Sequence, residues 1–166
     1  MQETKYPLIS RLLSKFIYEP DTGVLYRKMQ TCIKQQPLSI SSNGYARVGF
    51  DGKRYGAHRI CWAMAHGYWP TLDIDHINGI RTDNRLCNLR HVDRSTNLEN
   101  IRAAKSNNKS SGILGVYVAK NGVITSRIMV KGKDTYLGTF KSIEEAKVAY
   151  VNAKKNMHKG FSSANI

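Results

Sequence analysis

The sequence is poor in acidic residues and has no long apolar run. Its 166 residues include 12 aspartates and glutamates against 26 lysines and arginines, for a formal net charge of +14. No stretch approaches the roughly 18 consecutive apolar residues of a membrane-spanning helix, and no basic-then-apolar signal begins the chain. We therefore expect a soluble, cytoplasmic protein that does not act on membranes.

Cysteines are few and odd in number. Cys32, Cys61 and Cys87 form no C-x-x-C pair. This spacing disfavours both a disulfide framework and a structural zinc site, so reduced cysteines that serve packing are the expectation. The excess of positive charge, by contrast, attracts polyanions and speeds encounter with them, which makes nucleic acid the predicted partner.

The segment 73–79 places a carboxylate beside an imidazole, at Asp75 and His76. Metal-assisted cleavage of a phosphodiester needs an oxygen ligand for a hard divalent cation and a neutral imidazole that deprotonates water. Neighbouring side chains of a strand point to opposite faces, so the two groups can approach a phosphate from two sides. The pair indicates a nuclease, although such a pair also serves as a capping or core-satisfying couple.

The residues around this pair have a recognisable local pattern. Alternating apolar and polar residues over 74–77 predict a strand, and residues 78–85 are typical of a turn-rich loop. A second short extended segment is expected over 86–92. Asp93 then has the character of a helix N-cap, which places Asn97 in the first turns of a short helix.

The run from Asp75 and His76 through Asn88 to Asn97 resembles the HNH family of endonucleases, and its spacing resembles the phage and intron-encoded homing enzymes. The resemblance implies a ββα-metal core in which His76 is the general base and Asn88 orients it. It also implies that Asp75 and Asn97 hold one divalent ion, Mg²⁺ with Mn²⁺ or another ion as a substitute. Without this joint pattern, turn formation and helix capping would explain both asparagines.

Several arginines surround this motif. Each contact between an arginine and a phosphate adds salt-dependent affinity, so we expect these side chains to grip DNA, with Arg85 the best single candidate. Solvated surface arginine is the alternative for any one of them. The set consists of Arg81, Arg85, Arg90, Arg94 and Arg102.

The N-terminal part reads as β-rich over residues 1–57, with a hairpin at the Asp51-Gly52 turn. A helix is expected over 58–67, where His58 matches a His-Arg pair common in HNH relatives, although a lone histidine is more often structural. Some hairpin residues can place basic or aromatic groups on DNA. A hairpin that turns its polar face to water explains their presence equally well. These residues are Tyr45, Arg47, Lys53 and Arg54.

A basic stretch without apolar residues, Lys105 to Gly112, indicates a linker. We therefore divide the chain into a nuclease domain over 1–102, whose core spans 72–102, a linker over 103–112 and a second domain over 113–166. Both domains have more basic than acidic residues.

The second domain has three strand-like segments, 113–119, 123–131 and 135–140. A helix follows, announced by the capping box of Ser142 and Glu145. This order predicts a three-stranded sheet covered by one helix on one face.

The segments Gly115-Val116-Tyr117, 136–140 and Ala149-Tyr150 make residues 111–165 similar to the plant APETALA/ethylene-response-factor type of DNA-binding domain. The resemblance implies that the sheet lies in the major groove, although most of the sheet arginines of that family are missing. By position, six residues match outward sites or hairpin ends of that family and are expected to contact DNA. The alternative is that the lysines are solvated and the tyrosines pack against the sheet. The six are Tyr117, Lys120, Arg127, Lys131, Lys133 and Tyr136.

These patterns predict an α+β protein: an HNH core of the ββα-metal type with a β-rich N-terminal part, and a small C-terminal domain of three strands and a helix. The expected function is metal-dependent hydrolysis of double-stranded DNA by a monomeric endonuclease of the homing type, in the host-cell cytoplasm if a phage encodes it. We expect site-selective cleavage or nicking of one strand, with double-strand cutting only through dimerisation or sequential action. A catalytically silent DNA-binding protein is the first alternative. A non-specific or RNA-directed nuclease is the second.

Overall fold

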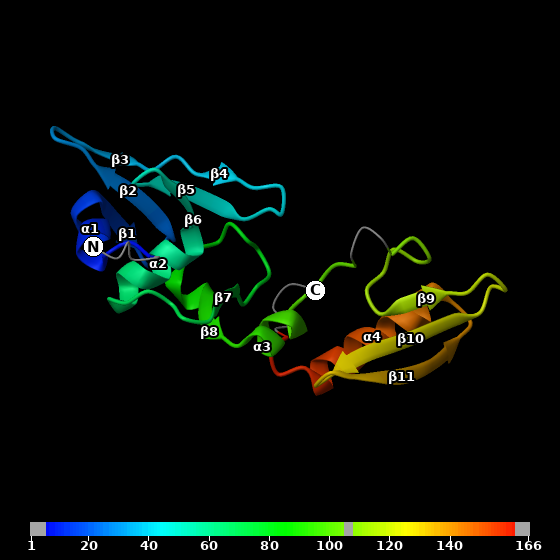
Figure 1. Cartoon of the computed structure of the whole chain (residues 1–166). Coiled ribbons are helices and arrows are strands. Elements are labelled where there is room, and N and C mark those ends of the chain that lie inside the picture. The colour runs from blue at the N-terminus through cyan, green and yellow to red at the C-terminus, as the bar shows by residue number, and fades with distance from the viewer. Residues whose placement is uncertain (1–5, 105–107, 162–166) are drawn as a thin grey trace. The chain divides into compact units, whose positions relative to one another are not determined.

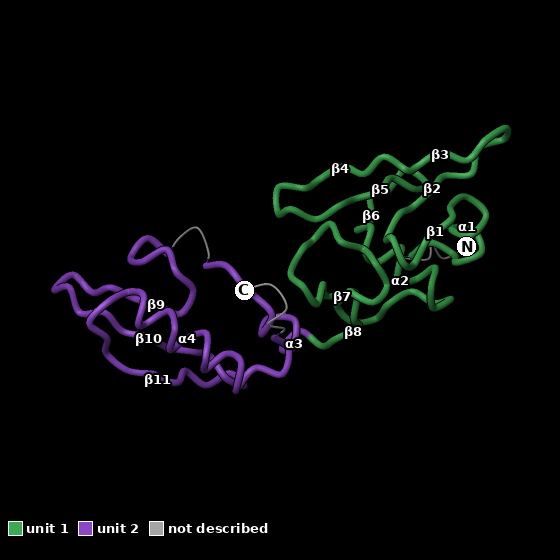
Figure 2. The backbone as a smooth tube through the Cα atoms, turned by 180° about the vertical axis from the view of Figure 1, so that it is seen from behind, with its two compact units in different colours: residues 1–93 green, residues 94–166 purple. Residues whose placement is uncertain are grey.

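The computed structural model describes residues 6–104 and 108–161. The contacts divide the chain into two compact units, residues 1–93 and 94–166 (Figure 2). The division falls after Asp93, whereas the sequence suggests a domain end at residue 102. Both units mix helices and strands (Figure 1). No helix of the described residues is long and apolar enough to cross a membrane.

The first unit has a β-rich N-terminal part, as predicted, which also contains a helix that the sequence analysis does not foresee. Its three antiparallel sheets have the orders β1-β2-β3, β4-β5-β6 and β7-β8. Its elements are α1 (Ile9–Lys15), β1 (Phe16–Glu19), β2 (Val24–Lys28), β3 (Ile33–Gln35), β4 (Ser39–Ile40), β5 (Ala46–Phe50), β6 (Lys53–Gly56), α2 (Ala57–His66), β7 (Asp73–His76), the 3-10 helix η1 (Leu86–Asn88) and β8 (Leu89–Val92).

One apolar core joins residues of α1, β1, β2, β5, α2, β7 and β8. Helix α2 contributes its buried face, including Ile60 and Cys61, and ends at Gly67, whose φ of 75° suits a glycine. Strand β5 alternates: Val48 and its inward neighbours are buried, while Arg47 is exposed. Because Ile74 and Leu89 of the β7-β8 pair belong to the same core, the core anchors the segment that carries Asp75 and His76.

The expected second extended segment is shorter than predicted. Strand β8 begins only at Leu89, because residues 86–88 form the 3-10 turn η1. The amide of Asn88 donates to the carbonyl oxygen of Arg85 at 2.9 Å, a bond that spans three residues. The turn brings Asn88 to the end of the loop rather than into the strand.

The second unit consists of a sheet with the order β11-β10-β9 and two helices. Its elements are α3 (Arg94–Glu99), β9 (Val116–Val118), β10 (Ile124–Val130), β11 (Lys133–Phe140) and α4 (Ile143–Met157). Figure 1 shows α4 along one face of this sheet, where Tyr150 and Ala153 pack against Ile128. The hydroxyl oxygen of Ser142 accepts from the backbone amide of Glu145 at 3.1 Å, which is one half of a capping box. The carboxylate of Glu145 accepts from the backbone amide of Lys141 at 3.1 Å, one residue before Ser142.

Helix α3 packs against the end of α4. The carboxylate of Glu99 accepts from the amide of Gly160 at 2.9 Å, and the ammonium group of Lys154 donates to the carbonyl oxygen of Ile101. A Cβ atom at Gly160 would clash with the carbonyl oxygen of Thr96. These contacts explain why residues 94–102 belong to the second unit.

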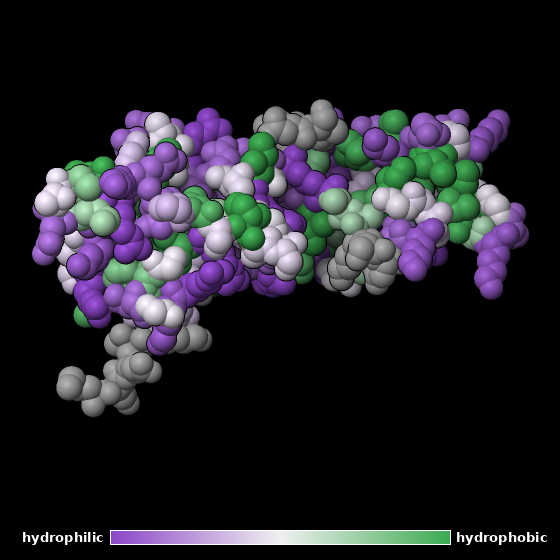
Figure 3. Space-filling view, turned by 90° about the horizontal axis from the view of Figure 1, so that it is seen from above, coloured by the Kyte–Doolittle hydropathy of each residue, from purple (hydrophilic) through white to green (hydrophobic). Residues whose placement is uncertain are grey.

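Hydrophilic side chains cover much of the surface that Figure 3 shows. This agrees with a composition in which charged residues make up 23% of the chain and basic residues predominate. The hydrophobic side chains on the same view form smaller groups among them.

Candidate active site

The pairing of β7 with β8 places Asp75 opposite Arg90 and His76 opposite Leu89. Asp75 is 7% exposed and His76 is 2% exposed. One carboxylate oxygen of Asp75, Oδ2, accepts from Nε of Arg90 at 2.9 Å and from Nη2 at 2.6 Å. Arg90, which the sequence suggests as a phosphate contact, thus pairs with the proposed metal ligand.

The imidazole of His76 has its side-chain hydrogen bond with Asn84, with 3.3 Å between Nε2 and Oδ1. Burial lowers the pKa of His76, while the bond from Asn84 and the charge of Asp75 act in the opposite direction. Because burial has the largest effect, the lowered pKa favours the neutral imidazole at neutral pH. A neutral imidazole is the form that can accept a proton.

Two further rings lie against His76. Their centroids are 5.3 Å away for His58, which meets His76 edge-on, and 5.9 Å away for Tyr45. Burial, followed by the neighbouring His76, lowers the pKa of His58 to about 3. His58 is therefore a neutral neighbour of the candidate base, and sequence reasoning missed it because the lone His-Arg pair gives no sign of this contact.

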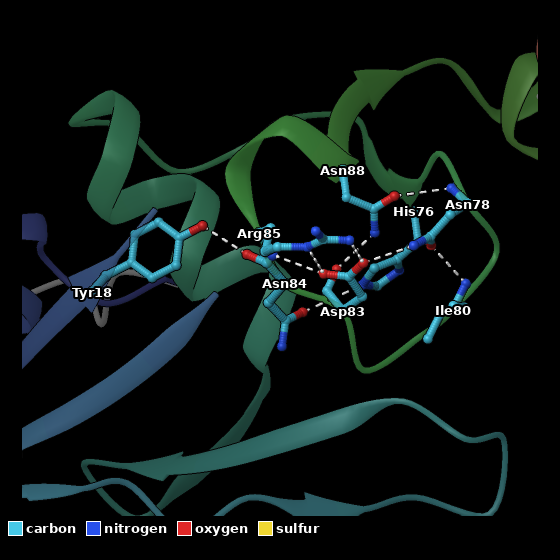
Figure 4. A network of polar contacts seen from close by, with 8 residues as sticks. All are labelled: Tyr18, His76, Asn78, Ile80, Asp83, Asn84, Arg85 and Asn88. Atoms are coloured by element: carbon cyan, nitrogen blue, oxygen red, sulfur yellow. Dashed lines mark hydrogen bonds and ion pairs between the residues drawn. The ribbon is translucent and has the colours of Figure 1, made fainter. Parts of the chain in front are cut away.

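The loop between β7 and β8 is closed by a network of side chains (Figure 4). The side chain of Asn88 accepts from the backbone amide of Asn78 at 2.9 Å, and it donates to the backbone carbonyl oxygen of Asp83 at 2.8 Å. The carboxylate of Asp83 accepts from Asn78 at 2.7 Å and from Arg85 at 2.8 and 2.6 Å. The hydrogen bonds from Arg85 contribute most to lowering the pKa of Asp83 to about 2. Asn88 therefore acts on the loop backbone, and the ring of His76 is bonded by Asn84.

The arginines of the first unit have different surroundings. Arg85 pairs with Asp83, and its side chain is 48% exposed. The guanidinium of Arg81 donates to the carbonyl oxygen of Asn43 at 2.6 Å and lies 5.1 Å from the centre of the Tyr45 ring. The remaining candidates of this unit are exposed to solvent: Arg47, Lys53 and Arg54.

In the second unit, the candidate DNA contacts of the sheet lie side by side. Arg127 on β10 pairs with Tyr136 on β11, with 5.5 Å between the guanidinium and the ring centre, and also bonds Asp134 at 2.7 Å. Tyr117 lies opposite Thr125, the residue two positions before Arg127. All of the candidates here are exposed: Tyr117, Lys120, Arg127, Lys131, Lys133 and Tyr136.

Arg94, Asn97 and Arg102 also fall in the second unit. Arg94 is exposed at the first position of α3, and Arg102 lies 5.2 Å from the ring centre of Phe161. Asn97 lies on α3 and Asp75 on β7, so the two proposed metal ligands come from different units.

The donor atoms suit a hard divalent cation, which prefers carboxylate and amide oxygens. Asp75 supplies a carboxylate and Asn97 an amide oxygen. Within residues 6–104 and 108–161, no group of three or more His, Cys, Asp or Glu side chains is placed to hold a metal ion.

Residues 55–102 match a family described as HNH endonuclease. The chain is also similar to a solved structure described as "DNA binding and cleavage by the HNH homing endonuclease I-HmuI", with 30% sequence identity and a TM-score of 0.42. This similarity covers 51% of the present chain, which spans 50% of the length of that protein. No curated protein matches the chain. Asp75, His76, Asn88 and Asn97 all lie within the segment that matches the HNH endonuclease family.

Proposed function

We propose that the protein is a metal-dependent DNA endonuclease in which His76 deprotonates the attacking water. The observation that carries this proposal is the buried, neutral His76 next to Asp75 within the matched HNH segment. An imidazole with a lowered pKa remains a proton acceptor at and below neutral pH.

The reaction is a hydrolysis at phosphorus. The oxygen of water forms a bond to phosphorus while one of its protons passes to His76, and the bond from phosphorus to the 3′ oxygen breaks. The 3′ oxygen takes a proton from solvent, so the products have a 5′-phosphate and a 3′-hydroxyl. His76 then returns its proton to solvent, which a lowered pKa favours.

Asp75 and Asn97 would hold Mg²⁺, with Mn²⁺ as a substitute. A bound divalent ion supplies stabilisation of the negative charge on the phosphate and the leaving oxygen. The two bonds from Arg90 hold the carboxylate of Asp75 in place. The assignment of Asn97 rests on the sequence pattern, and with one neutral ligand the site gains affinity when a DNA phosphate is present.

The substrate would be double-stranded DNA, bound by basic residues of both units. In the second unit the exposed neighbours Arg127 and Tyr136, with Tyr117 on the adjacent strand, would contact DNA in the manner of an APETALA-type domain. One proposed catalytic histidine in each chain favours a monomer that nicks one strand. The HNH pattern that ends in Asn97 favours the homing type.

Incubation of purified protein with supercoiled plasmid, in Mg²⁺, in Mn²⁺ and in EDTA, tests this proposal. Nicked product should appear with either metal and be lost in EDTA and in His76→Ala. His66→Ala is the matched control, since His66 is an exposed histidine that stacks on Trp62. Tight DNA binding without metal-dependent cleavage would instead favour a silent DNA-binding protein.

A further inference from the structure

The hairpin β1-β2 lies outside the segment that matches the HNH family, yet it contacts the loop of the site. The hydroxyl of Tyr18 on β1 donates to the carbonyl oxygen of Asn84 at 2.7 Å (Figure 4). The amide of Leu86 donates to the carbonyl oxygen of Pro20 at 2.8 Å. The hairpin therefore forms hydrogen bonds with the loop on both sides of Arg85, at Asn84 and at Leu86.

The turn of the hairpin lies very close to the same backbone. Gly23 has a φ of 76°, and a Cβ atom there would lie 2.5 Å from the backbone nitrogen of Arg85. Only glycine fits both the left-handed conformation and this approach. The contact with the loop thus depends on a glycine within the hairpin turn.

The side chain of Asn84 extends from this anchored backbone and contacts His76, the proposed base. Asn84 and His76 are each 2% exposed, and Oδ1 of Asn84 is 3.3 Å from Nε2 of His76. An amide oxygen only accepts hydrogen bonds, whereas a neutral imidazole has one donor nitrogen and one acceptor nitrogen. Nε2 of His76 must then carry the proton, and Nδ1 is the basic nitrogen.

We propose that Tyr18 and Asn84 are positioning residues for His76: the hairpin β1-β2 holds Asn84, and Asn84 fixes the tautomer in which Nδ1 is the base. This inference rests on the proposed function, since it concerns the same histidine. It gives the N-terminal hairpin, which lies outside the matched segment, a role in positioning the proposed catalytic histidine.

The half-buried Tyr18 is suited to this task. Burial, with nearby acidic groups adding to it, raises the pKa of its hydroxyl, so Tyr18 keeps the proton that it donates to Asn84. Tyr26 on the adjacent strand offers a comparison, because its hydroxyl donates to the carboxylate of Glu19 at 3.4 Å, a bond within the hairpin. Tyr26→Phe removes an equivalent group from the same hairpin.

The test uses the full chain with ¹⁵N-labelled histidine, because the nitrogen shifts of an imidazole report its tautomer directly. Wild-type His76 should be protonated at Nε2 above its pKa. Asn84→Leu should give a mixture of both tautomers, Asn84→Asp should keep the wild-type tautomer, and Tyr18→Phe should give a smaller mixture than Asn84→Leu. Tyr26→Phe should match the wild type.

Single-turnover cleavage and DNA affinity complete the test. Asn84→Leu should lower the cleavage rate by roughly tenfold to a hundredfold, the range over which orienting partners act, while DNA affinity stays unchanged. Asn84→Asp should restore much of the rate and move the acid limb of the pH–rate profile upward, since a carboxylate favours the protonated imidazole. A role in folding alone would produce neither the tautomer change nor this shift of the profile.

Two results would overturn the inference: a pure Nε2–H tautomer in a folded Asn84→Leu variant, or an unchanged cleavage rate in that variant. Failure of the proposed function is distinguishable. A wild-type protein that binds DNA but does not cleave it, while the tautomer of His76 still depends on Asn84, would remove the nuclease assignment and support the positioning contact.

Discussion

The guanidinium of Arg90 donates two hydrogen bonds to the same oxygen of Asp75 across the β7-β8 pair, at 2.9 and 2.6 Å. The carboxylate is 9% exposed and the arginine side chain 23% exposed, so solvent screens this ion pair little. Arg90 is thus a structural partner of the proposed metal ligand, and its contact with DNA stays a prediction.

Replacement of Arg90 by leucine should lower the free energy of unfolding by about 3 kcal/mol, because it leaves a buried carboxylate without its guanidinium. Urea unfolding measures this change. The control is Arg11→Leu, which breaks the exposed pair with Asp51 at 3.0 Å and should cost less than about 1 kcal/mol. Equal losses in the two variants would contradict the assigned importance of burial at Asp75.

The stability of the first unit should fall in acid because of His58. Its pKa is about 3 in the folded protein against an ordinary value of 6.5, so between these values the unfolded chain binds a proton that the folded chain does not. Stability is therefore fully present above pH 6.5 and falls by up to about 1.4 kcal/mol for each pH unit below it. Unfolding curves from pH 7 to pH 4 should show a shallower decline for His58→Phe. An identical decline would exclude His58 as the cause.

Cleavage should persist to a pH below the usual range of histidine. The pKa of His76 is lowered by burial, so its neutral, proton-accepting form remains populated as the pH falls. The acid limb of the single-turnover rate should therefore lie below pH ~6.5, the ordinary value for an imidazole. A limb above that value, measured at saturating Mn²⁺, would contradict the burial of His76 in the active protein.

Gly160→Ala should loosen helix α3. The added methyl group would clash with the carbonyl oxygen of Thr96, and the bond from the amide of Gly160 to Glu99 would lengthen. Overpacking of this kind costs about 1–3 kcal/mol. Hydrogen exchange of the amides over 94–101 should accelerate in this variant. The exposed neighbour serves as the control, because Lys159→Ala should leave the exchange rates unchanged.

Arg127→Gln should weaken DNA binding and reduce its dependence on salt. Loss of one phosphate contact lowers the slope of log affinity against log salt concentration by about 1. Titrations from low to moderate salt measure this slope. Arg11→Gln, a change in an arginine outside the proposed contacts, should leave it unaltered. Equal slopes for wild type and Arg127→Gln would place Arg127 outside the interface.

Elements that depend on neighbours in the chain were predictable. The helix expected over 58–67 is α2, Ala57–His66, and the capping box at Ser142 begins α4. The three C-terminal segments contain β9, β10 and β11 within or close to the predicted ranges. Capping, turn chemistry and side-chain alternation act over a few residues, so they are legible in the sequence.

Contacts between distant residues were not predictable in this way. The sequence singles out Asp75 and His76 as a chemical pair, and it predicts that Asn88 orients the histidine. Only the folded chain shows that Asn84 bonds the ring, whereas the side chain of Asn88 bonds the loop backbone and its carbonyl oxygen accepts from the backbone amide of Ile77, next to His76. Likewise, the packing of Gly160 on Thr96 places α3 in the second unit, a result that no local pattern of charge or linker composition indicates.

The sequence by itself determined the candidate groups: a basic chain with an HNH pattern, whose spacing singles out a carboxylate, an imidazole and two amides. The tertiary structure decided which groups act on that imidazole. Tyr18 reaches Asn84 from 66 positions away, and Arg90 reaches Asp75 from 15 positions away. Such bonds form only after the chain folds back and brings distant strands together. The distance and angle that a hydrogen bond requires then decide which of several similar side chains becomes the partner.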